Sequence, residues 1–498
     1  MNIAYNIVFC TDINGGISKN NKIPWNINED SQYFRDLINL TYNSKKNIFI
    51  MGRNTYLQMK ELIKDNVCII ITSSDNLIGL DKPNIIRLIN CNDINNTVIN
   101  LMNSGNYYNI YVLGGSGIYN YFFKNYYNFN INIYWNLINT NYNCDNLLDT
   151  YIFNYLNNIK CKFNNIKIQC LNNNTQQQIE LTIYRPFNMN KSMKIVELTS
   201  NNDEENYLSL MKKILETGIR EKCRNGYTRS LFGNILTFNL DRFPLLTTKK
   251  TFLPGIFEEL MFFIKGQTNA KILSDKGVKI WDKNTSKKFI EKCGLNYEEG
   301  DMGPMYGFQW RHFNAEYMGM DKNYEGKGYD QLAYVLETLK TDPKSRRILL
   351  TTYNPSMAKQ GVLFPCHGVT IMFHTNFIDN NNLTLDIMQT QRSCDYFLGV
   401  PFNIASYSLL VYMICHVLNN DESCQYKYKP GKLVMNLGDY HLYEEHLQQA
   451  QRQILRTPLQ FPQLNIKNKV FKLEDFKFDD IELINYQCYP GIKAEMIE

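Results

Sequence analysis

The pattern of apolar and polar residues divides the chain into two halves of different texture. In the first half, short apolar runs such as Val67–Ile71 and Ile110–Leu113 predict buried strands. Asn alternates with apolar residues from Asn128 to Tyr134, which predicts a half-buried strand. Helical patterns fall between these runs, at Asp30–Leu40 and Gly117–Lys124. Strands that alternate with helices predict an α/β domain.

The two halves are predicted to join through a short polar segment. Ile179–Tyr184 is expected to be the last strand of the first half. Asn202 or Asp203 is expected to cap the first helix of the second half, which Gly218 ends. The second half is expected to be one larger α+β unit. The predicted division is therefore a domain over 1–186, a linker over 187–202 and a domain over 203–498.

Composition narrows the class of protein. The 498 residues are 44% hydrophobic and 20% charged, as in ordinary soluble globular proteins. The net charge of +5 is too mild to require a nucleic-acid partner, but it suits small anionic substrates. The thirteen cysteines show no CxxC and no zinc-like spacing, which favours a reduced, cytoplasmic chain without a metal. No secretory leader opens the sequence, and the apolar stretch Ser408–Leu418 is too short to span a membrane.

Three glycine-containing turns in the first half carry candidate chemistry. They are Gly15-Gly16, Gly52-Arg53 and Gly114-Gly115, each beside an apolar run. Taken singly, each is an ordinary turn between strand and helix. Such turns also let backbone N–H groups approach a phosphate, and two of them in one small domain suggest a dinucleotide. Asp30 is either a helix N-terminal charge or, if buried, a proton donor.

The order Pro-Trp…Asp…Phe, Met-Gly-Arg-Asn-Thr and Leu-Gly-Gly-Ser-Gly-Ile-Tyr resembles dihydrofolate reductase over residues 1–186. By that resemblance Asp30 binds the pteridine ring and assists its protonation, and Phe34 packs on the folate. Ile23 and Trp25 would belong to a mobile loop, and Asn136 falls where the family usually has a Thr near the pterin. NADPH would be held by Arg53, Asn54, Thr55, Ser73, Gly114, Gly115, Ser116 and Tyr119.

One position departs from the reductase pattern. The family has an Arg before the Cys68–Thr72 strand that binds the substrate's glutamate carboxylate, and Val67 occupies that place here. Val cannot bind an anion. Lys60 and Lys64 precede it four residues apart, and we predict that Lys64 partly substitutes as a weaker, monodentate partner. The alternative is that Lys64 is a solvated surface charge.

The second half contains a candidate nucleophile. Cys366 lies beside His367 after an apolar run, and a thiol attacks only as thiolate, so it needs nearby positive charge. Arg346-Arg347 and Arg392 are candidates for that charge and for gripping a phosphate. Taken alone, such a cysteine is usually a packed core thiol, and paired arginines are usually a solvated face.

A long collinear series of motifs resembles thymidylate synthase over residues 203–498. The motifs are DRFPLLTTKK, ELMFFIKGQTN, IWD, GDMGPMYGFQWR, DPKSRRILLTTYNP, FPCH, QRSCDYFLGVPFN, GDYHLY and YPGIKAEMIE. The resemblance implies a homodimer in which Arg346 and Arg347 reach the phosphate of the partner's substrate. It also implies that the C-terminal tail closes over the ternary complex.

The resemblance also assigns roles to single residues. Cys366 would add to C6 of dUMP, with Arg392 binding phosphate and favouring the thiolate. Asn403 would read the uracil edge. The residues implied to bind dUMP are Arg224, Arg346, Arg347, Gln391, Arg392, Ser393, Asn403, His441 and Tyr443. Those implied to contact 5,10-methylenetetrahydrofolate are Trp281 and Asp395, and those implied to organise proton transfers are Glu259, Tyr306 and His367. For the first phosphate Arg, Arg220 and Arg229 are alternatives to Arg224.

The two resemblances share one logic, because thymidylate synthase releases the dihydrofolate that the reductase restores. They imply a fused enzyme of the type found in protists and plants. One alternative is a nucleotide hydroxymethylase acting on dCMP. Asn403 argues against it, because a carboxylate would suit the cytosine amino edge better than an amide. A second alternative is that one half is a non-enzymatic interaction module, but Cys366 and Asp30 are both present and no basic–aromatic stripe is seen.

Overall fold

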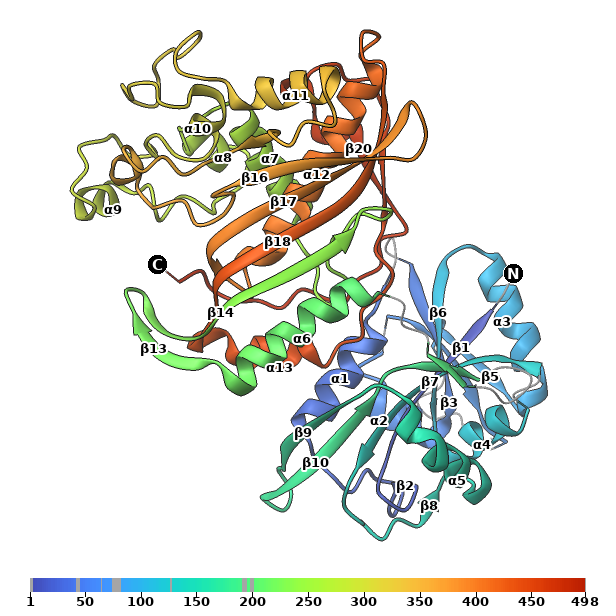
Figure 1. Cartoon of the computed structure of the whole chain (residues 1–498). Coiled ribbons are helices and arrows are strands. Elements are labelled where there is room, and N and C mark those ends of the chain that lie inside the picture. Colours follow the sequence, from blue (N-terminus) through green and yellow to red (C-terminus); the bar gives the residue numbers. More distant parts are fainter. Residues whose placement is uncertain are drawn as a thin grey trace.

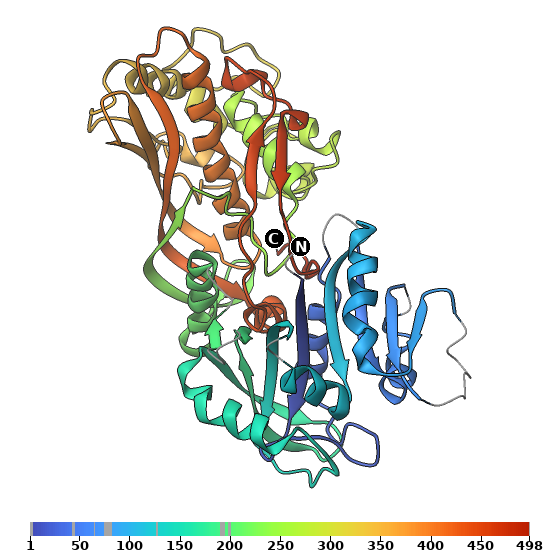
Figure 2. The same cartoon turned by 90° about the vertical axis from the view of Figure 1, so that its right-hand side faces the viewer.

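The structure, a computed structural model, contains two lobes that meet along one side (Figures 1 and 2). It describes residues 3–41, 45–63, 65–73, 82–125, 128–189, 195–197 and 201–497. Lys64, the predicted carboxylate partner, lies outside these residues. Lys60 is exposed and follows the end of helix α2 (Arg53–Met59).

The first lobe is built on one mixed sheet. Its strand order is β12-β11-β7-β1-β6-β3-β4-β5, and β10 joins β7 to β9. The strands from β7 to β5 along this order are parallel, and β9, β10 and β11 are antiparallel to their neighbours. The strands are β1 (Ala4–Thr11), β3 (Lys46–Gly52), β4 (Val67–Ile71), β5 (Ile85–Leu88), β6 (Tyr107–Gly114), β7 (Asn130–Ile138), β9 (Asn165–Asn172), β10 (Gln177–Tyr184), β11 (Phe187–Met189) and β12 (Ile195–Glu197).

Helices alternate with these strands, as the apolar pattern predicts. They are α1 (Asn28–Ile38), α2 (Arg53–Met59), α3 (Ile94–Asn103), α4 (Ser116–Lys124) and α5 (Thr150–Ile159), with short turns η1 (Cys91–Asp93) and η3 (Lys160–Lys162). A small ribbon pairs β2 (Gly16–Ser18) with β8 (Asn146–Leu147). The α/β class of the first half is confirmed.

The segment after Tyr184 differs from the prediction. Ile179–Tyr184 lies in β10 but is not the last strand, because β11 and β12 follow within residues 187–202. Phe187 and Met189 are only 1% and 2% exposed, and β11 pairs with β7. Two apolar side chains separated by Asn188 are enough to anchor a short strand on the core. The first part of the predicted linker is therefore part of the first lobe's sheet.

The second lobe has one six-stranded sheet in the order β13-β14-β18-β17-β16-β15. The strands are β13 (Ile219–Cys223), β14 (Gly226–Asn239), β15 (Leu349–Leu350), β16 (Ile371–Phe377), β17 (Asn382–Asp395) and β18 (Lys427–Tyr443). A two-stranded ribbon pairs β19 (Gln463–Ile466) with β20 (Ile481–Ile484). The helices are α6 (Asn202–Thr217), α7 (Leu253–Ile264), α8 (Lys271–Ser274), α9 (Lys287–Lys292), α10 (Gly307–His312), α11 (Gln331–Thr341), α12 (Gly399–Asn420) and α13 (Leu447–Ile454), with turns η4 (Ala358–Gln360), η5 (Glu444–His446), η6 (Leu473–Asp475) and η7 (Phe478–Asp480).

The N-cap of helix α6 lies one residue before Asn202 and two before Asp203, the two predicted caps. Asn201 is the N-cap, because its side chain accepts the backbone N–H of Glu204 at 3.1 Å. Gly218 ends the helix as predicted. Asn202 and Asp203 lie instead in the first turn.

Helix α12 forms the centre of the second lobe. It is 22 residues long and apolar enough to cross a membrane by composition alone, but 83% of its most apolar stretch is buried inside the fold. That burial is typical of a core helix in a globular domain.

The sheet of the second lobe has two different faces. Along β17, residues from Leu383 to Gln391 are buried at every second position, and those between are only half-buried. On β14, Phe232 is 84% exposed and Ile235 is 59% exposed. One face therefore packs on the lobe's own helices, and the other is uncovered in the single chain.

Candidate active sites

One cavity of about 810 Å³ gathers the residues predicted for the reductase. It lies in the first lobe, beside α1, the start of α2 and the start of α4. Lining it are Ile23, Trp25, Asp30, Phe34, Arg53, Asn54, Thr55, Ser73, Gly115, Ser116, Tyr119 and Asn136. Of the residues predicted to hold NADPH, all of which the structure describes, Gly114 alone does not line it.

Asp30 lies in the first turn of α1 and also faces this cavity. Asn136, at the end of β7, donates a hydrogen bond of 2.7 Å to its carboxylate. Burial raises the pKa of Asp30, and the Asn136 hydrogen bond opposes that rise. Asp30 is therefore both a helix N-terminal charge and a carboxyl group that holds its proton more tightly than one in water.

Two strand-to-helix turns abut at the other end of the cavity. Gly52 precedes α2 and Gly115 precedes α4, and a Cβ on Gly52 would lie 3.9 Å from the Gly115 nitrogen. Arg53 brings a fixed positive charge to the same place, and its Nε has no hydrogen-bond partner among the described residues. Backbone N–H groups at the start of α4 and a guanidinium fit the phosphates of a dinucleotide.

Gly114 and Tyr119 pack against each other beside the turn that precedes α4. Gly114 has φ +96°, and a Cβ there would lie 2.6 Å from the Tyr119 ring. The Tyr119 hydroxyl donates to the Val8 carbonyl at 2.8 Å and so ties α4 to β1. Gly at this position is required by close packing as well as by its backbone conformation.

In the second lobe, Cys366 contacts groups from two other segments of the chain. The Tyr306 hydroxyl lies 3.4 Å from its Sγ and accepts its backbone N–H at 3.2 Å. The Arg392 backbone N–H donates to the Cys366 carbonyl at 2.8 Å, and that of Ser393 does so at 3.4 Å. Burial raises the pKa of the Cys366 thiol, while the Tyr306 hydrogen bond and the Arg392 charge lower it. The thiolate is therefore favoured only when further positive or hydrogen-bonding groups act on it.

A buried acid and a neutral imidazole lie behind the cysteine. Glu259 on α7 accepts a 2.9 Å hydrogen bond from the Trp281 indole. Burial raises the pKa of Glu259 to about 7, against the lowering effect of that bond. His367 stacks on Tyr306 with ring centroids 4.5 Å apart, and burial lowers its pKa to about 3. At neutral pH Glu259 can therefore exchange a proton, whereas His367 stays uncharged.

Tyr407 is a residue of this site that the sequence motifs missed. Its hydroxyl lies 2.8 Å from His367 Nδ1. It lies four residues after Asn403 in α12, so both side chains point from the same helix face. That spacing was the available signal, but Tyr407 stands in a long apolar run in which an aromatic residue predicts core packing.

Two amides are arranged beside the cysteine. Gln391 Nε2 donates to Asn403 Oδ1 at 2.7 Å, and both side chains are buried. In this orientation Asn403 keeps its NH₂ group and one carbonyl lone pair for a ligand. A donor beside an acceptor complements the N3/O4 edge of uracil.

The end of β18 contributes two polar side chains. His441 Nδ1 lies 2.6 Å from the Asp439 carboxylate, which orients the ring. Burial raises the pKa of Tyr443 to about 12, an effect that the nearby charge of Arg224 opposes. Asp395, at the end of β17, accepts the backbone N–H groups of Phe397 and Leu398 at 3.0 and 2.9 Å.

The three candidates for the first phosphate Arg differ in their partners. Arg220 binds the Glu444 carboxylate through two hydrogen bonds, of 2.6 and 3.0 Å. Arg229 donates to the Leu215 carbonyl at 3.1 Å. Arg224, at the tip of the β13–β14 hairpin, donates to the neighbouring Asn225 side chain at 2.8 Å and has no other hydrogen-bonding partner among the described residues. Its guanidinium is therefore the most available of the three.

Arg346 and Arg347 are not brought to Cys366 of the same chain. Both are exposed and precede β15 at the edge of the sheet. Within the described residues neither guanidinium has a hydrogen-bonding or ionic partner. The Arg392 side chain, in contrast, emerges beside the Cys366 loop, with its nitrogens 3.4 Å from the Pro365 and Phe364 carbonyls.

Comparison with known proteins gives a consistent result for both lobes. A dihydrofolate reductase family model matches residues 4–184, and a thymidylate synthase family model matches residues 205–498. A bifunctional dihydrofolate reductase-thymidylate synthase of Paramecium tetraurelia is 33% identical over 501 residues, which cover 99% of both chains. The thymidylate synthase of Candida albicans is 46% identical over 320 residues, covering 60% of this chain and 99% of that one.

The fold and the two sites define a two-domain enzyme, with a dinucleotide-type pocket in one lobe and a cysteine beside Tyr306 and Arg392 in the other. The chain belongs to the bifunctional dihydrofolate reductase–thymidylate synthase family. It converts dUMP to dTMP with 5,10-methylenetetrahydrofolate and reduces dihydrofolate to tetrahydrofolate with NADPH. The resemblances inferred from the motifs are therefore confirmed at the level of family and activity.

Proposed function

We propose that Cys366 is the nucleophile of the synthase. Its thiolate would form a bond to C6 of dUMP, and the electron pair displaced from the C5–C6 double bond would make C5 the carbon that accepts the one-carbon unit. The observation that carries this proposal is the half-buried Cys366, with the Tyr306 hydroxyl 3.4 Å from its Sγ and the Arg392 backbone N–H bound to its carbonyl. The bound phosphate would hold C6 close to sulfur.

The other dUMP contacts are proposed from the residues that surround Cys366. Asn403, oriented by Gln391, would read the uracil edge, which favours dUMP over dCMP as the substrate. His441 and Tyr443 would hold the deoxyribose hydroxyl. Arg224 would join Arg392 and Ser393 at the phosphate. Trp281 and Asp395 would contact the folate co-substrate.

Proton transfers in the synthase would centre on Glu259. Its raised pKa of about 7 lets it both hold and release a proton near neutral pH. His367, neutral and fixed by Tyr407, would order the groups around the ring rather than carry charge. Tyr306 would hydrogen-bond the reacting sulfur.

In the reductase, Asp30 would bind the pteridine ring and supply a proton while NADPH, when bound, supplies hydride. The residues present fit NADPH, since Arg53 keeps an unpartnered buried Nε among the described residues at the helix starts that line the cavity. Asn54, Thr55, Ser73, Gly115 and Ser116 would complete its site, with Gly114 and Tyr119 shaping it from behind. Phe34 and Asn136 would contact folate.

We also propose that the synthase is a homodimer with composite sites. The uncovered sheet face carries Phe232 and Ile235, 84% and 59% exposed, and an apolar face of this kind is typical of an interface. Arg346 and Arg347 are exposed with unpartnered guanidiniums among the described residues, as expected if they bind the partner's phosphate. A twofold axis through the sheet face would make the two sites equivalent.

Mixing two inactive variants tests the composite site. In Cys366→Ala the nucleophile is lost, and in Arg347→Glu the donated phosphate ligand is lost. A hybrid dimer contains one site with both lesions and one with neither, so an equal mixture after subunit exchange should recover about a quarter of the parental synthase activity. Proven exchange without recovery would show that each site is built from a single chain. Reductase activity in every sample is the internal control.

The cellular setting and domain division are further proposals. All thirteen cysteines are free, which suits a reducing cytoplasm. We place the boundary between the domains after β12, which still pairs in the reductase sheet, and before α6 begins at Asn202.

A further inference from the structure

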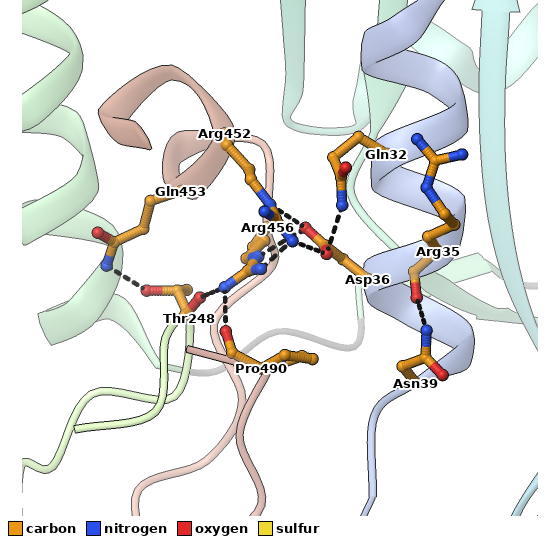
Figure 3. Close-up of polar contacts among 9 residues, drawn as sticks. All are labelled: Gln32, Arg35, Asp36, Asn39, Thr248, Arg452, Gln453, Arg456 and Pro490. Carbon is orange, nitrogen blue, oxygen red and sulfur yellow. Dashed lines mark hydrogen bonds and ion pairs between the residues drawn. The ribbon is translucent and has the colours of Figure 1, made fainter. Parts of the chain in front are cut away.

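A buried carboxylate joins the two domains (Figure 3). Asp36, on reductase helix α1, has a side chain only 4% exposed. Arg452 of α13 binds it through Nε at 3.0 Å and Nη2 at 2.5 Å, and the Arg456 Nε donates to it at 2.9 Å. Gln32, one turn earlier on α1, donates to the same carboxylate at 2.8 Å. Synthase side chains thus bind a carboxylate of the reductase directly.

Arg456 fixes this contact within the synthase. Its side chain is completely buried, and Nη1 donates to the carbonyls of Thr248 and Pro490 at 2.6 and 2.8 Å. Thr248 is held in turn by buried Glu204. Because the guanidinium is planar and has two further buried partners, it presents Asp36 with a donor of fixed direction.

Asp36 lies on the opposite side of α1 from the substrate pocket. Residues four apart share a helix face, so Asp30 and Phe34 point together into the cavity. A residue two positions on is rotated by roughly 200°, so Asp36 points away from Phe34, as Gln32 points away from Asp30. One face of α1 therefore meets dihydrofolate while the other meets the synthase.

The C-terminal segment of the synthase packs against the same helix. Tyr489 is 1% exposed and lies beside Tyr33 and Tyr134, both of which line the reductase cavity. Burial first, and then the neighbouring Tyr489, raises the pKa of Tyr33 and of Tyr134. Cys488 forms a backbone bridge with Thr41, just beyond the end of α1. The synthase tail thus covers the outer side of the wall of the reductase pocket.

We propose that the synthase domain positions the substrate-binding helix of the reductase, with Asp36 as the positioning residue held by Arg452 and Arg456. This inference rests on the proposed roles of Asp30 and Phe34. The two ion pairs of Asp36 set the rotation and axial position of α1. The positions of the Asp30 and Phe34 side chains depend on both. Asp36 touches no substrate, and its effect reaches dihydrofolate only through α1.

The test is Asp36→Asn in the full-length chain, with steady-state constants measured for both activities. The amide keeps the shape but loses the charge that two guanidiniums bind. A shift of about 1 Å in a positioned group can cost up to about 100-fold, so a partial shift of α1 should raise the KM for dihydrofolate roughly 3- to 30-fold. The KM for NADPH and the synthase constants should stay within about twofold, a split that general loss of folded enzyme would not produce.

Glu205→Gln is the matched control. It removes the ion pair of 3.1 Å between Arg185 and Glu205, at the same domain interface, and neither residue is among the hydrogen-bonding or ionic partners of Asp36 in the described part of the chain. The proposal expects no change in the KM for dihydrofolate. An equal rise in both variants would overturn it, because the effect would then come from domain docking in general. A folded Asp36→Asn enzyme with parental KM would overturn it as well.

Arg452→Met keeps the proposal testable if Asp36→Asn does not fold. The Arg452 side chain is 34% exposed, and its removal leaves the buried Arg456 pair in place. A smaller rise in the same KM, roughly 2- to 5-fold, is expected because one of two grips remains, and no rise would overturn the proposal. Asp30→Asn separates this failure from failure of the proposed function, since loss of its reductase turnover alone would uphold the site while α1 positioning fails.

Discussion

The two active sites differ in how completely their groups are connected before any ligand is considered. In the synthase, Cys366 contacts Tyr306, Gln391 binds Asn403 and Glu259 binds Trp281, so each group is already oriented by a neighbour. In the reductase, Asp30 has its Asn136 bond, but Arg53 Nε and Asn136 Oδ1 are buried without partners among the described residues. Gln391 Oε1 of the first site is also buried without a partner among the described residues, but the reacting groups of that site orient one another, whereas in the second site Arg53 Nε and Asn136 Oδ1 are left for ligands to satisfy.

The contrast extends to the two acids. Both Asp30 and Glu259 have raised pKa values because burial disfavours the charged form. The Glu259 side chain is buried and its pKa rises to about 7, while Asp30 lines a cavity. Burial therefore raises the pKa of the acid in both the reductase and the synthase. The groups around each acid determine which group exchanges a proton with it.

The largest effect is expected from Cys366→Ser. A serine hydroxyl is far less acidic than a thiol, so neither Tyr306 nor Arg392 can generate the nucleophile. We expect dTMP formation to fall by at least about 10⁴-fold, as for other enzymes that lose their nucleophile. Dihydrofolate reduction by the same protein should be unchanged. dTMP formation near the parental rate would refute the assignment.

Asp30→Asn should produce the reverse pattern, with a loss of roughly 10²- to 10³-fold in reductase kcat at neutral pH. An amide cannot supply the proton, and the synthase should be unaffected. The pH dependence of the parental reductase activity also tests the role of Asp30. Asp30 must be protonated to donate, so parental activity should fall as pH rises through its pKa, and the raised pKa moves that fall to higher pH than for a carboxyl in water. If Asp30→Asn shows the same fall in reductase activity at high pH, a group other than Asp30 titrates there.

The smallest effect concerns Asn136, measured as reductase kcat/KM. Asn136→Ala removes the 2.7 Å bond to Asp30. Because that bond lowers the pKa of the carboxyl, the fall in activity on the alkaline side should move to higher pH. The rate at neutral pH should change by about 3- to 10-fold. Asn136→Thr retains a donor and should stay within about threefold of the parent. If Thr is as impaired as Ala, the hydrogen bond is not what Asn136 contributes.

Local patterns predicted much of the fold because they report local physics. Apolar runs marked β4 and β6, and helical periodicity marked α1 and α4 to within a few residues. The strand β11 was missed because Phe187 and Met189 are too few to form a periodic signal. Only the neighbouring strand β7 makes their burial favourable.

The sites were predicted through motifs, and the contacts between distant segments were not. Sequence order could not choose among Arg220, Arg224 and Arg229, because the choice depends on Glu444, which lies 224 residues after Arg220. The pairing of Asp36 with Arg452 spans 416 residues and leaves no local trace. Charge pairing across a fold is set by tertiary geometry, which propensity and periodicity do not encode.

The alternating faces of β17 have an evolutionary consequence. Neighbouring residues near its end serve different ligand groups, since Gln391 points into the core toward Asn403 and Arg392 emerges on the exposed side. The side-chain period of a strand is two, so inserting or deleting a single residue before Gln391 would exchange the two side chains. Substitutions elsewhere in β17 can be absorbed one at a time, but a change in its length would disable base and phosphate recognition together. Insertions and deletions in β17 should therefore be tolerated less often than most substitutions within it.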